Sequence, residues 1–139
     1  MDLYITNELN STNKTYVRDK IIEFNFMHFP RELSSRYQEV NLYLKNEQGQ
    51  LVGGLVSEIC FNWLEISYLF VEEAYRKLGY GLKMMNEAEI IAKEKKCDFI
   101  KVDTLSFQAL DFYKKLGYEV YGTINNAGGY THYYLKKDL

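Results

Sequence analysis

The sequence has only two cysteines, one proline and no long hydrophobic run. Cys60 and Cys97 lie in apolar or helix-end surroundings without metal-ligand spacing, so we expect free thiols and no metal site. No apolar stretch approaches the ~20 residues that a membrane-spanning helix needs. The first residues also lack the basic and apolar pattern of a signal peptide. These absences predict a cytoplasmic protein with no membrane partner.

An excess of either charge is also missing. The 17 Lys and Arg residues nearly balance the 19 Asp and Glu residues, which gives a net charge of −2. This balance offers no basic surface for a nucleic acid, so we expect no such partner. The length of 139 residues indicates one domain spanning residues 1–139. The 13 tyrosines are numerous, and we expect most of them to fill strands.

The stretch from Val71 to Leu82 places two glycines where a strand is expected to end and a helix to begin. Gly79 and Gly81 allow a tight turn that points several backbone N–H groups at one place. The positive end of the helix dipole and the cations of Arg76 and Lys77 favour an anion there. We therefore predict that this loop binds a pyrophosphate.

Two other pyrophosphate loops fit the sequence less well. A Rossmann fingerprint needs a third glycine where Met84 stands and normally follows the first strand, although Asp103 lies about where a ribose-binding acid would be. A P-loop needs the order Gly-Lys-Ser/Thr, which the sequence does not contain. A plain strand-to-helix turn that binds nothing is the remaining alternative.

Hydrophobic periodicity predicts the other elements. Apolar residues recur at helical spacing before Pro30, so we expect a helix that ends near Met27. The pair Gly53-Gly54 suggests a bulge or bend in a long strand. The predicted elements are a strand at 3–5, a helix capped by Ser11 or Thr12 with Val17, Ile21, Phe24 and His28 on one face, a short helix or loop at 31–39, strands at 40–44, 51–61 and 63–71, a helix at 82–95, a strand at 98–103, a helix capped by Ser106 and ending at Gly117, a strand at 118–121, a loop at 125–129 and a strand at 130–136.

Two motifs together resemble the GNAT superfamily of N-acetyltransferases. Arg76, Gly79 and Gly81 follow the order Arg-x-x-Gly-x-Gly of its acetyl-CoA loop. The segment from Ser106 to Tyr118 resembles its pattern Asn/Ser-x-x-Ala-x-x-Phe-Tyr-x-x-x-Gly-Phe/Tyr, at the expected separation. The predicted order of elements agrees over the whole chain. The sequence departs from the family where Lys77 replaces a common glycine and Glu73 stands near a common proline, but neither change removes a phosphate donor.

The resemblance implies an α/β (α+β) fold with a mixed, mostly antiparallel, twisted sheet of six or seven strands and helices on both faces. The crossover between residues 66 and 103 should be right-handed and its two parallel strands should splay apart. The implied activity moves an acetyl group from acetyl-CoA to a primary amine of a small molecule or protein, in a ternary complex. A non-catalytic acyl-CoA sensor or scaffold is the alternative, and a homodimer is compatible with the sequence.

The resemblance also implies which residues hold acetyl-CoA. A bulge at the end of the strand would free backbone N–H groups for the thioester and for pantetheine, and the glycine loop would hold the pyrophosphate. The implied cofactor-binding residues are Leu69, Phe70, Val71, Arg76, Lys77, Leu78, Gly79, Tyr80, Gly81, Leu82, Ser106, Gln108 and Ala109.

Two residues are catalytic candidates. Tyr113 stands where the family commonly places a tyrosine, and a phenol near pKa 10 is a plausible proton donor to a departing thiolate. Its alternative is a core tyrosine. Glu65 is the candidate base. Simple alternation places it on one face with Trp63, Ser67 and Leu69, where we expect it to be partly shielded from water. It could equally be a structural or substrate-anchoring carboxylate. We predict no catalytic role for His132 or His28.

Overall fold

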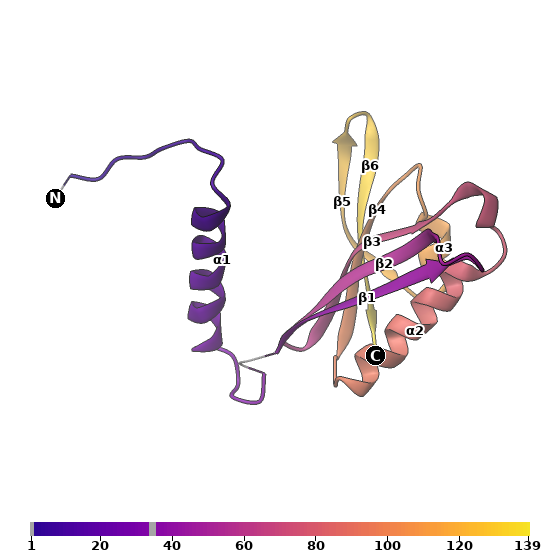
Figure 1. Cartoon of the computed structure of the whole chain (residues 1–139), viewed down its shortest axis with the longest axis horizontal. Helices are drawn as coiled ribbons and strands as arrows, with labels where there is room; N and C mark the ends of the chain where they lie inside the picture. Colours follow the sequence, from indigo (N-terminus) through magenta and orange to yellow (C-terminus); the bar gives the residue numbers. More distant parts are fainter. Residues whose placement is uncertain (1, 34–35) are drawn as a thin grey trace. The chain divides into compact units, whose positions relative to one another are not determined.

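The computed structural model describes residues 2–33 and 36–139, which belong to two compact units. The first unit contains helix α1 (Ser11–Phe26), and the second contains the sheet with its helices (Figure 1). Both cysteines are buried and free, as predicted. No helix in the described part of the chain is long and apolar enough to cross a membrane.

The N-cap of helix α1 is Asn10, one residue before the predicted caps Ser11 and Thr12. Asn10 has an extended backbone, and its side chain accepts a hydrogen bond from the backbone N–H of Asn13 at 3.0 Å. The prediction that Ser11 or Thr12 caps the helix is therefore wrong, because the residue before them already satisfies the first turn. The helix ends at Phe26, close to the predicted end and before Pro30.

The predicted strand at residues 3–5 is also wrong. Residues 2–10 have no regular secondary structure, and the side chains of Leu3, Tyr4 and Ile5 are exposed. A lone extended segment cannot pair its backbone N–H and C=O groups, so short apolar alternation does not suffice to make a strand. The described sheet consequently has six strands, the lower of the two predicted numbers.

The sheet of the second unit has the order β1-β2-β3-β4-β6-β5. The β3–β4 pair is parallel and the other neighbouring pairs are antiparallel, which confirms the predicted mixed sheet. Gly128 and Gly129 have φ angles of +64° and +87°, which suit a two-residue hairpin, so the loop predicted at 125–129 is shorter than expected. The strands are β1 (Tyr37–Lys45), β2 (Leu51–Cys60), β3 (Trp63–Val71), β4 (Phe99–Leu105), β5 (Glu119–Ala127) and β6 (Tyr130–Asp138).

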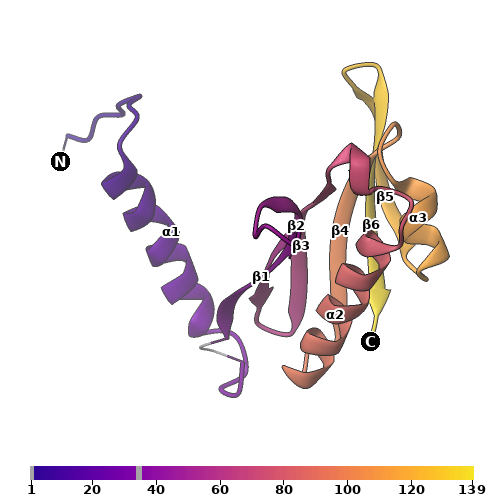
Figure 2. The same cartoon turned by 45° about the vertical axis from the view of Figure 1, so that its right-hand side comes forward.

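Two helices complete the second unit. α2 (Tyr80–Glu94) joins β3 to β4, and α3 (Leu110–Lys115) joins β4 to β5. Both views show these helices next to each other (Figures 1 and 2). They contribute to one hydrophobic core with the strands, whose most buried side chains are Leu55, Ile59, Leu64, Met85, Ile100 and Leu135. The side chains that alternate with the core residues form the second face of the sheet, which includes Trp63, Glu65, Lys101, Asp103 and Tyr134.

One extra residue in β3 reverses the alternation of its side chains. Ile66 is paired with Ser57 and Tyr68 with Val56, so Ser67 is the bulged residue. Side chains before and after the bulge therefore alternate differently: Leu69 packs against the core although Glu65 does not. The prediction that Glu65 shares a face with Leu69 is wrong for this reason.

The glycine pair of β2 lies beside a second irregularity. Leu44 is paired with Gly53 and Lys45 with Leu51, so the extra residue is Val52, next to the predicted bulge or bend. A Cβ atom on Gly53 would lie 2.7 Å from the carbonyl oxygen of Phe70, which excludes a larger residue without a backbone shift. This glycine therefore lets β2 approach the end of β3 closely.

Candidate active site

The parallel strands β3 and β4 separate where the bulge begins. Their pairing runs from Trp63–Phe99 to Ile66–Val102, whereas β3 continues to Val71 and β4 to Leu105. Backbone groups that β3 turns towards β4 beyond this point lie outside the sheet ladder and can bind a ligand. The strands therefore splay as predicted, with the bulge at Ser67 rather than in the predicted segment Leu69–Val71.

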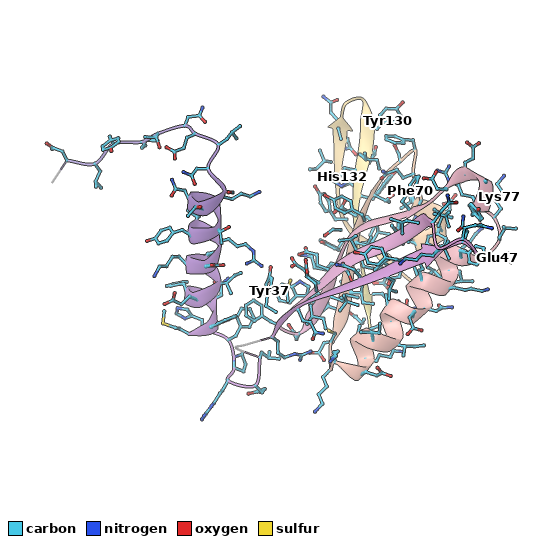
Figure 3. All side chains as sticks on the ribbon, in the orientation of Figure 1. Tyr37, Glu47, Phe70, Lys77, Tyr130 and His132 are labelled. Carbon is cyan, nitrogen blue, oxygen red and sulfur yellow. The ribbon has the colours of Figure 1, made fainter. Side chains whose placement is uncertain are left out.

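The glycine loop ends in a helix start suited to an anion. Gly79 is the N-cap of α2 with φ +86°, a left-handed conformation that favours glycine. Lys77 is also left-handed, with φ +62°, and lies on the loop between β3 and α2 (Figure 3). Because this N-cap is a glycine, it has no side chain to accept a hydrogen bond from the first turn of α2. The N–H groups of that turn thus point outward at the positive end of the helix dipole.

The second glycine of the loop has a different environment from the first. A Cβ atom on Gly81 would lie 3.5 Å from the ring of Phe112 in α3. That distance is an ordinary van der Waals contact, so an alanine would fit beside α3. Of the two glycines of the motif, only Gly79 has the positive φ that favours glycine.

Arg76 connects the loop to the end of β3. Its Nε donates a hydrogen bond to the carbonyl oxygen of Val71 at 2.7 Å, and its guanidinium lies 5.3 Å from the ring centroid of Phe70. The arginine therefore fixes the end of β3 relative to the loop.

The loop between β4 and α3 is held by its own side chains. Gln108 Oε1 accepts a hydrogen bond from the backbone N–H of Leu105 at 2.7 Å, and Ala109 donates its N–H to Thr104 Oγ1 at 3.2 Å. Ser106 Oγ accepts from the backbone N–H of Thr131 in β6 at 3.2 Å. The prediction that Ser106 caps α3 is therefore wrong. Its hydroxyl is bound to β6, and α3 begins four residues later.

Tyr113 lies in the core near the separated strands. Tyr113 is only 5% exposed, and its ring makes edge-on contacts with the rings of Phe112 and Tyr118. Burial, and secondarily the negative charge of Asp103, raise the pKa of Tyr113 to about 12. The hydroxyl therefore stays protonated at neutral pH, which a proton donor requires.

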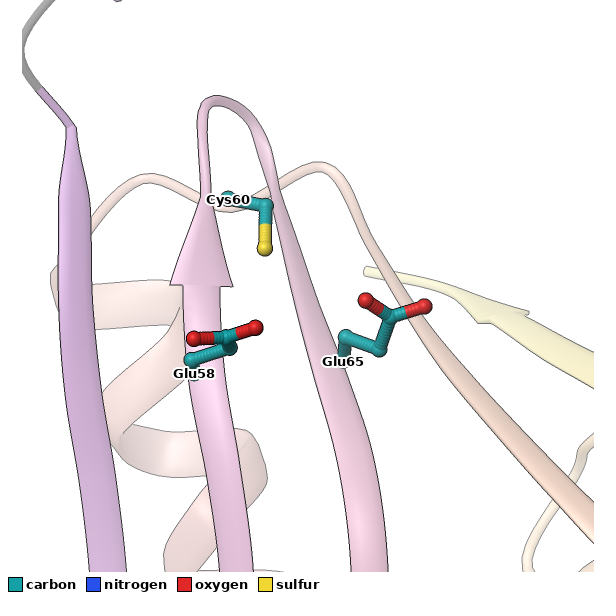
Figure 4. Close-up of side chains that lie close together, drawn as sticks. All are labelled: Glu58, Cys60 and Glu65. Carbon is teal, nitrogen blue, oxygen red and sulfur yellow. The ribbon is translucent and has the colours of Figure 1, made fainter. Parts of the chain in front are cut away.

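Glu65 has a different environment from the predicted one. Its Oε1 lies 3.5 Å from Lys101 Nζ, and its side chain is 43% exposed. Glu58 is its cross-strand partner, and the ligand atoms of Glu58, Cys60 and Glu65 lie within 4.8 Å of one another (Figure 4). Burial and the nearby Glu58 raise the pKa of the Cys60 thiol to about 11, so it stays neutral and is a poor nucleophile.

A cavity of about 230 Å³ lies on the second face, where β3 and β4 stop pairing. Two of its lining residues, Asp103 and Tyr134, bond to one histidine: Asp103 Oδ1 lies 3.0 Å from His132 Nε2, and Tyr134 Oη lies 3.2 Å from His132 Nδ1. Figure 3 shows His132 on β6. The lining residues are Glu65, Ile66, Lys101, Val102, Asp103, Tyr121 and Tyr134.

The sequence predicted no catalytic role for His132 and did not single out Tyr134. His132 and Tyr134 alternate on one strand without a motif, so only that shared face was visible in the sequence. Their position beside Asp103 depends on the antiparallel pairing of β4 with β6, which joins residues far apart in the chain.

Comparisons with known proteins identify the family. The model of the acetyltransferase (GNAT) family matches residues 7–118. Blasticidin-S acetyltransferase of Streptomyces morookaense is 35% identical over 99 residues, which cover 70% of this chain and 73% of that protein. A crystal structure of an acetyltransferase from Bacillus cereus is 37% identical with a TM-score of 0.87, covering 99% of this chain and 98% of that one.

A more distant structure shares only the fold. An aminoglycoside 6'-N-acetyltransferase solved with coenzyme A is 20% identical, with a TM-score of 0.62, and the match covers 78% of this chain and 76% of that one. The glycine loop, the splayed strands and the match over most of the chain lead to one conclusion: this chain belongs to the GNAT family of acetyltransferases.

Proposed function

We propose that this protein transfers the acetyl group of acetyl-CoA to a primary amine, by direct attack in a ternary complex. The observation that carries the proposal is the gap between β3 and β4, which opens beside the uncapped start of α2. Family membership supports acetyl-CoA as the cosubstrate. The family match begins in the first unit and continues into the second, which supports one domain over residues 1–139.

The two ends of the gap suit the two halves of the cosubstrate. The pyrophosphate accepts hydrogen bonds from the N–H groups of the glycine loop, and Arg76 and Lys77 supply positive charge. The pantetheine arm lies between β3 and β4 and bonds to the backbone of residues 69–71. The β4–α3 loop, with Ser106, Gln108 and Ala109, borders the arm on its other side.

The reaction begins when a neutral amine attacks the thioester carbonyl. Backbone N–H groups of β3 beyond Ser67 stabilise the oxyanion that forms, a term that is often large. The tetrahedral intermediate then expels the thiolate, and the C–S bond breaks as Tyr113 donates its hydroxyl proton to the sulfur. The buried thiol of Cys60 takes no part, so the acetyl group passes directly to the amine.

The acceptor that suits the site is a small cationic amine. The wall of the cavity of about 230 Å³ includes the carboxylates of Glu65 and Asp103, which favour a positively charged group. Glu65 faces the ammonium of Lys101, and an acceptor amine can replace that ammonium as its partner. We therefore assign Glu65 the anchoring role, in preference to that of the base. The name of the blasticidin-S relative is consistent with an amine-bearing small molecule.

Calorimetry and a thiol-release assay test the proposal together. We expect acetyl-CoA to bind at sub-millimolar concentration and thiol to appear with at least one amine from a panel of small cationic acceptors and peptides. Arg76→Ala and Lys77→Ala should weaken acetyl-CoA binding, whereas Lys93→Ala, at the far end of α2, should not. Failure to bind acetyl-CoA would exclude the proposal. Binding without thiol release from any amine would instead support a non-catalytic acyl-CoA sensor.

A further inference from the structure

Three side chains form a hydrogen-bonded chain beside the cavity. Tyr134 lines the cavity, and its hydroxyl lies 3.2 Å from His132 Nδ1. On the other side of the imidazole, Nε2 lies 3.0 Å from Asp103 Oδ1. The side chain of His132 is 25% exposed and that of Asp103 is 55% exposed. Both ends of this hydrogen-bonded chain therefore line the cavity, and its His132 and Asp103 side chains also reach solvent.

The chemistry of the three groups gives the chain a direction. A carboxylate only accepts hydrogen bonds, so the partner of Asp103 is a protonated Nε2. In the neutral imidazole Nδ1 then carries no proton and accepts from the hydroxyl of Tyr134. This arrangement leaves the lone pairs of the Tyr134 oxygen for a donor in the cavity.

The position of the chain matches that of the reacting nitrogen. The cavity lies at Ile66 and Val102, the last residue pair before β3 and β4 separate. Under the proposed function the thioester lies just beyond this pair, so an amine in the cavity is next to the carbonyl carbon. Tyr113 is on the core side of the same region, since the charge of Asp103 influences its pKa.

The lysines near the three hydrogen-bonded side chains are paired with carboxylates and not with Tyr134. Lys101 of β4 pairs with Glu65 of β3, and Lys136 of β6 pairs with Asp138. From β5, the ring of Tyr121 lies 6.4 Å from that of Tyr134. The carboxylate nearest to the imidazole is therefore Asp103, which stabilises a positive charge on it.

We propose that Tyr134, His132 and Asp103 relay the proton that the acceptor amine loses. The inference rests on the proposed function and assigns the proton acceptor that Glu65 was expected to be. As the nitrogen bonds to the acetyl carbon, its N–H bond breaks and the proton passes to the Tyr134 oxygen. The hydroxyl proton of Tyr134 passes to His132 Nδ1, and Asp103 stabilises the imidazolium without taking a proton. The imidazolium then releases its proton to water, which restores the neutral relay.

Three variants test the relay: Tyr134→Phe, His132→Gln and Asp103→Asn. Tyr134→Phe should lower kcat by about 100-fold or more, in the range of general acid–base contributions, with acetyl-CoA affinity unchanged. Tyr130→Phe is the matched control, because it removes a hydroxyl from the same strand outside the cavity, and it should keep wild-type kcat. Thermal unfolding and acetyl-CoA calorimetry confirm that each variant folds.

The dependence of kcat on pH separates a relay from a structural contact. Histidine ordinarily changes protonation between pH 5 and 8, and the relay needs it neutral, so wild-type kcat should fall on the acid side. His132→Gln should lower kcat and remove this acid limb. Asp103→Asn should also lower kcat, because the charge that stabilises the imidazolium is gone. If His132→Gln does not fold, the kcat of Asp103→Asn tests the relay in its place.

The outcomes distinguish the relay from the function on which it rests. If the wild type turns over and the tyrosine and histidine variants stay within twofold of it at every pH, the relay is wrong and the acetyltransferase function stands. If the wild type binds acetyl-CoA but releases no thiol with any amine, both are wrong.

Discussion

Lys101 Nζ lies 3.5 Å from Glu65 Oε1, and the two residues are register partners across the parallel strands β3 and β4. The pair stands beside the cavity at the point where those strands separate. Exposed ion pairs of this kind contribute at most about 1 kcal/mol to stability, so its interest is chemical. It places a carboxylate on the cavity wall that an acceptor ammonium can use.

We expect Glu65→Gln to weaken acceptor binding more than it slows the chemical step. Loss of one charge-assisted contact should raise the acceptor KM about tenfold, with little change in kcat or acetyl-CoA affinity. Glu87→Gln, on the exposed surface of α2, is the control and should change none of these. A fall in kcat of two orders of magnitude at constant KM would instead make Glu65 the base.

Lys77→Gly should separate stability from cofactor binding. The left-handed backbone of Lys77, at φ +62°, is strained for a residue with a side chain, and glycine should raise the free energy of unfolding by about 1 kcal/mol. The same variant should weaken acetyl-CoA binding, because the cation is lost. Lys96 has φ +60° at the other end of α2, so Lys96→Gly should stabilise without changing affinity. Denaturant titration and calorimetry measure the two effects, and equal losses of affinity in both variants would exclude a role for the Lys77 charge.

Gly53→Ala should disturb the end of β3 from the neighbouring strand. The new Cβ would lie 2.7 Å from the Phe70 carbonyl oxygen and 3.2 Å from the Val71 Cα, both backbone atoms. We expect a loss of about 1–3 kcal/mol in unfolding free energy, together with weaker acetyl-CoA binding. Gly122→Ala serves as the stability control, because its Cβ would only reach the Tyr134 ring at 3.9 Å. A Gly53→Ala protein as stable as the control would show that β2 does not constrain β3 there.

Tyr113→Phe should lower kcat by about 100-fold or more if the phenol protonates the departing thiolate. The thermal stability should change little, because phenylalanine keeps the ring packed between Phe112 and Tyr118. Pre-steady-state thiol release is the measurement. Turnover as fast as that of the wild type would leave Tyr113 as a core tyrosine only.

The same variant should alter stability in alkali. The folded-state pKa of Tyr113, about 12, exceeds the ordinary value of 10, so the unfolded chain loses the proton first. The contribution of this residue to stability is therefore complete below pH 10 and is lost as the pH rises towards 12, at about 1.4 kcal/mol per pH unit. Tyr113→Phe should flatten the decline of unfolding free energy in this interval, as followed by urea titration. An unchanged slope would mean that Tyr113 is not shielded from water.

Local patterns in the sequence predict much of this fold. The glycine loop, the helix after it and the hairpin strands follow from periodicity and turn residues, and the two motifs predict the family. The bulge at Ser67 could not be predicted, because a single extra residue is decided by the pairing with β2. The bond between Ser106 and Thr131 and the contacts of His132 depend likewise on β6, which lies far along the chain.

A crystal structure of the protein with acetyl-CoA tests the central claim most directly. The account predicts the diphosphate on the N–H groups of α2's first turn, between Gly79 and Leu82, with the pantetheine arm in the gap between β3 and β4. A complex in which the ligand binds elsewhere, and those N–H groups face water, would contradict it.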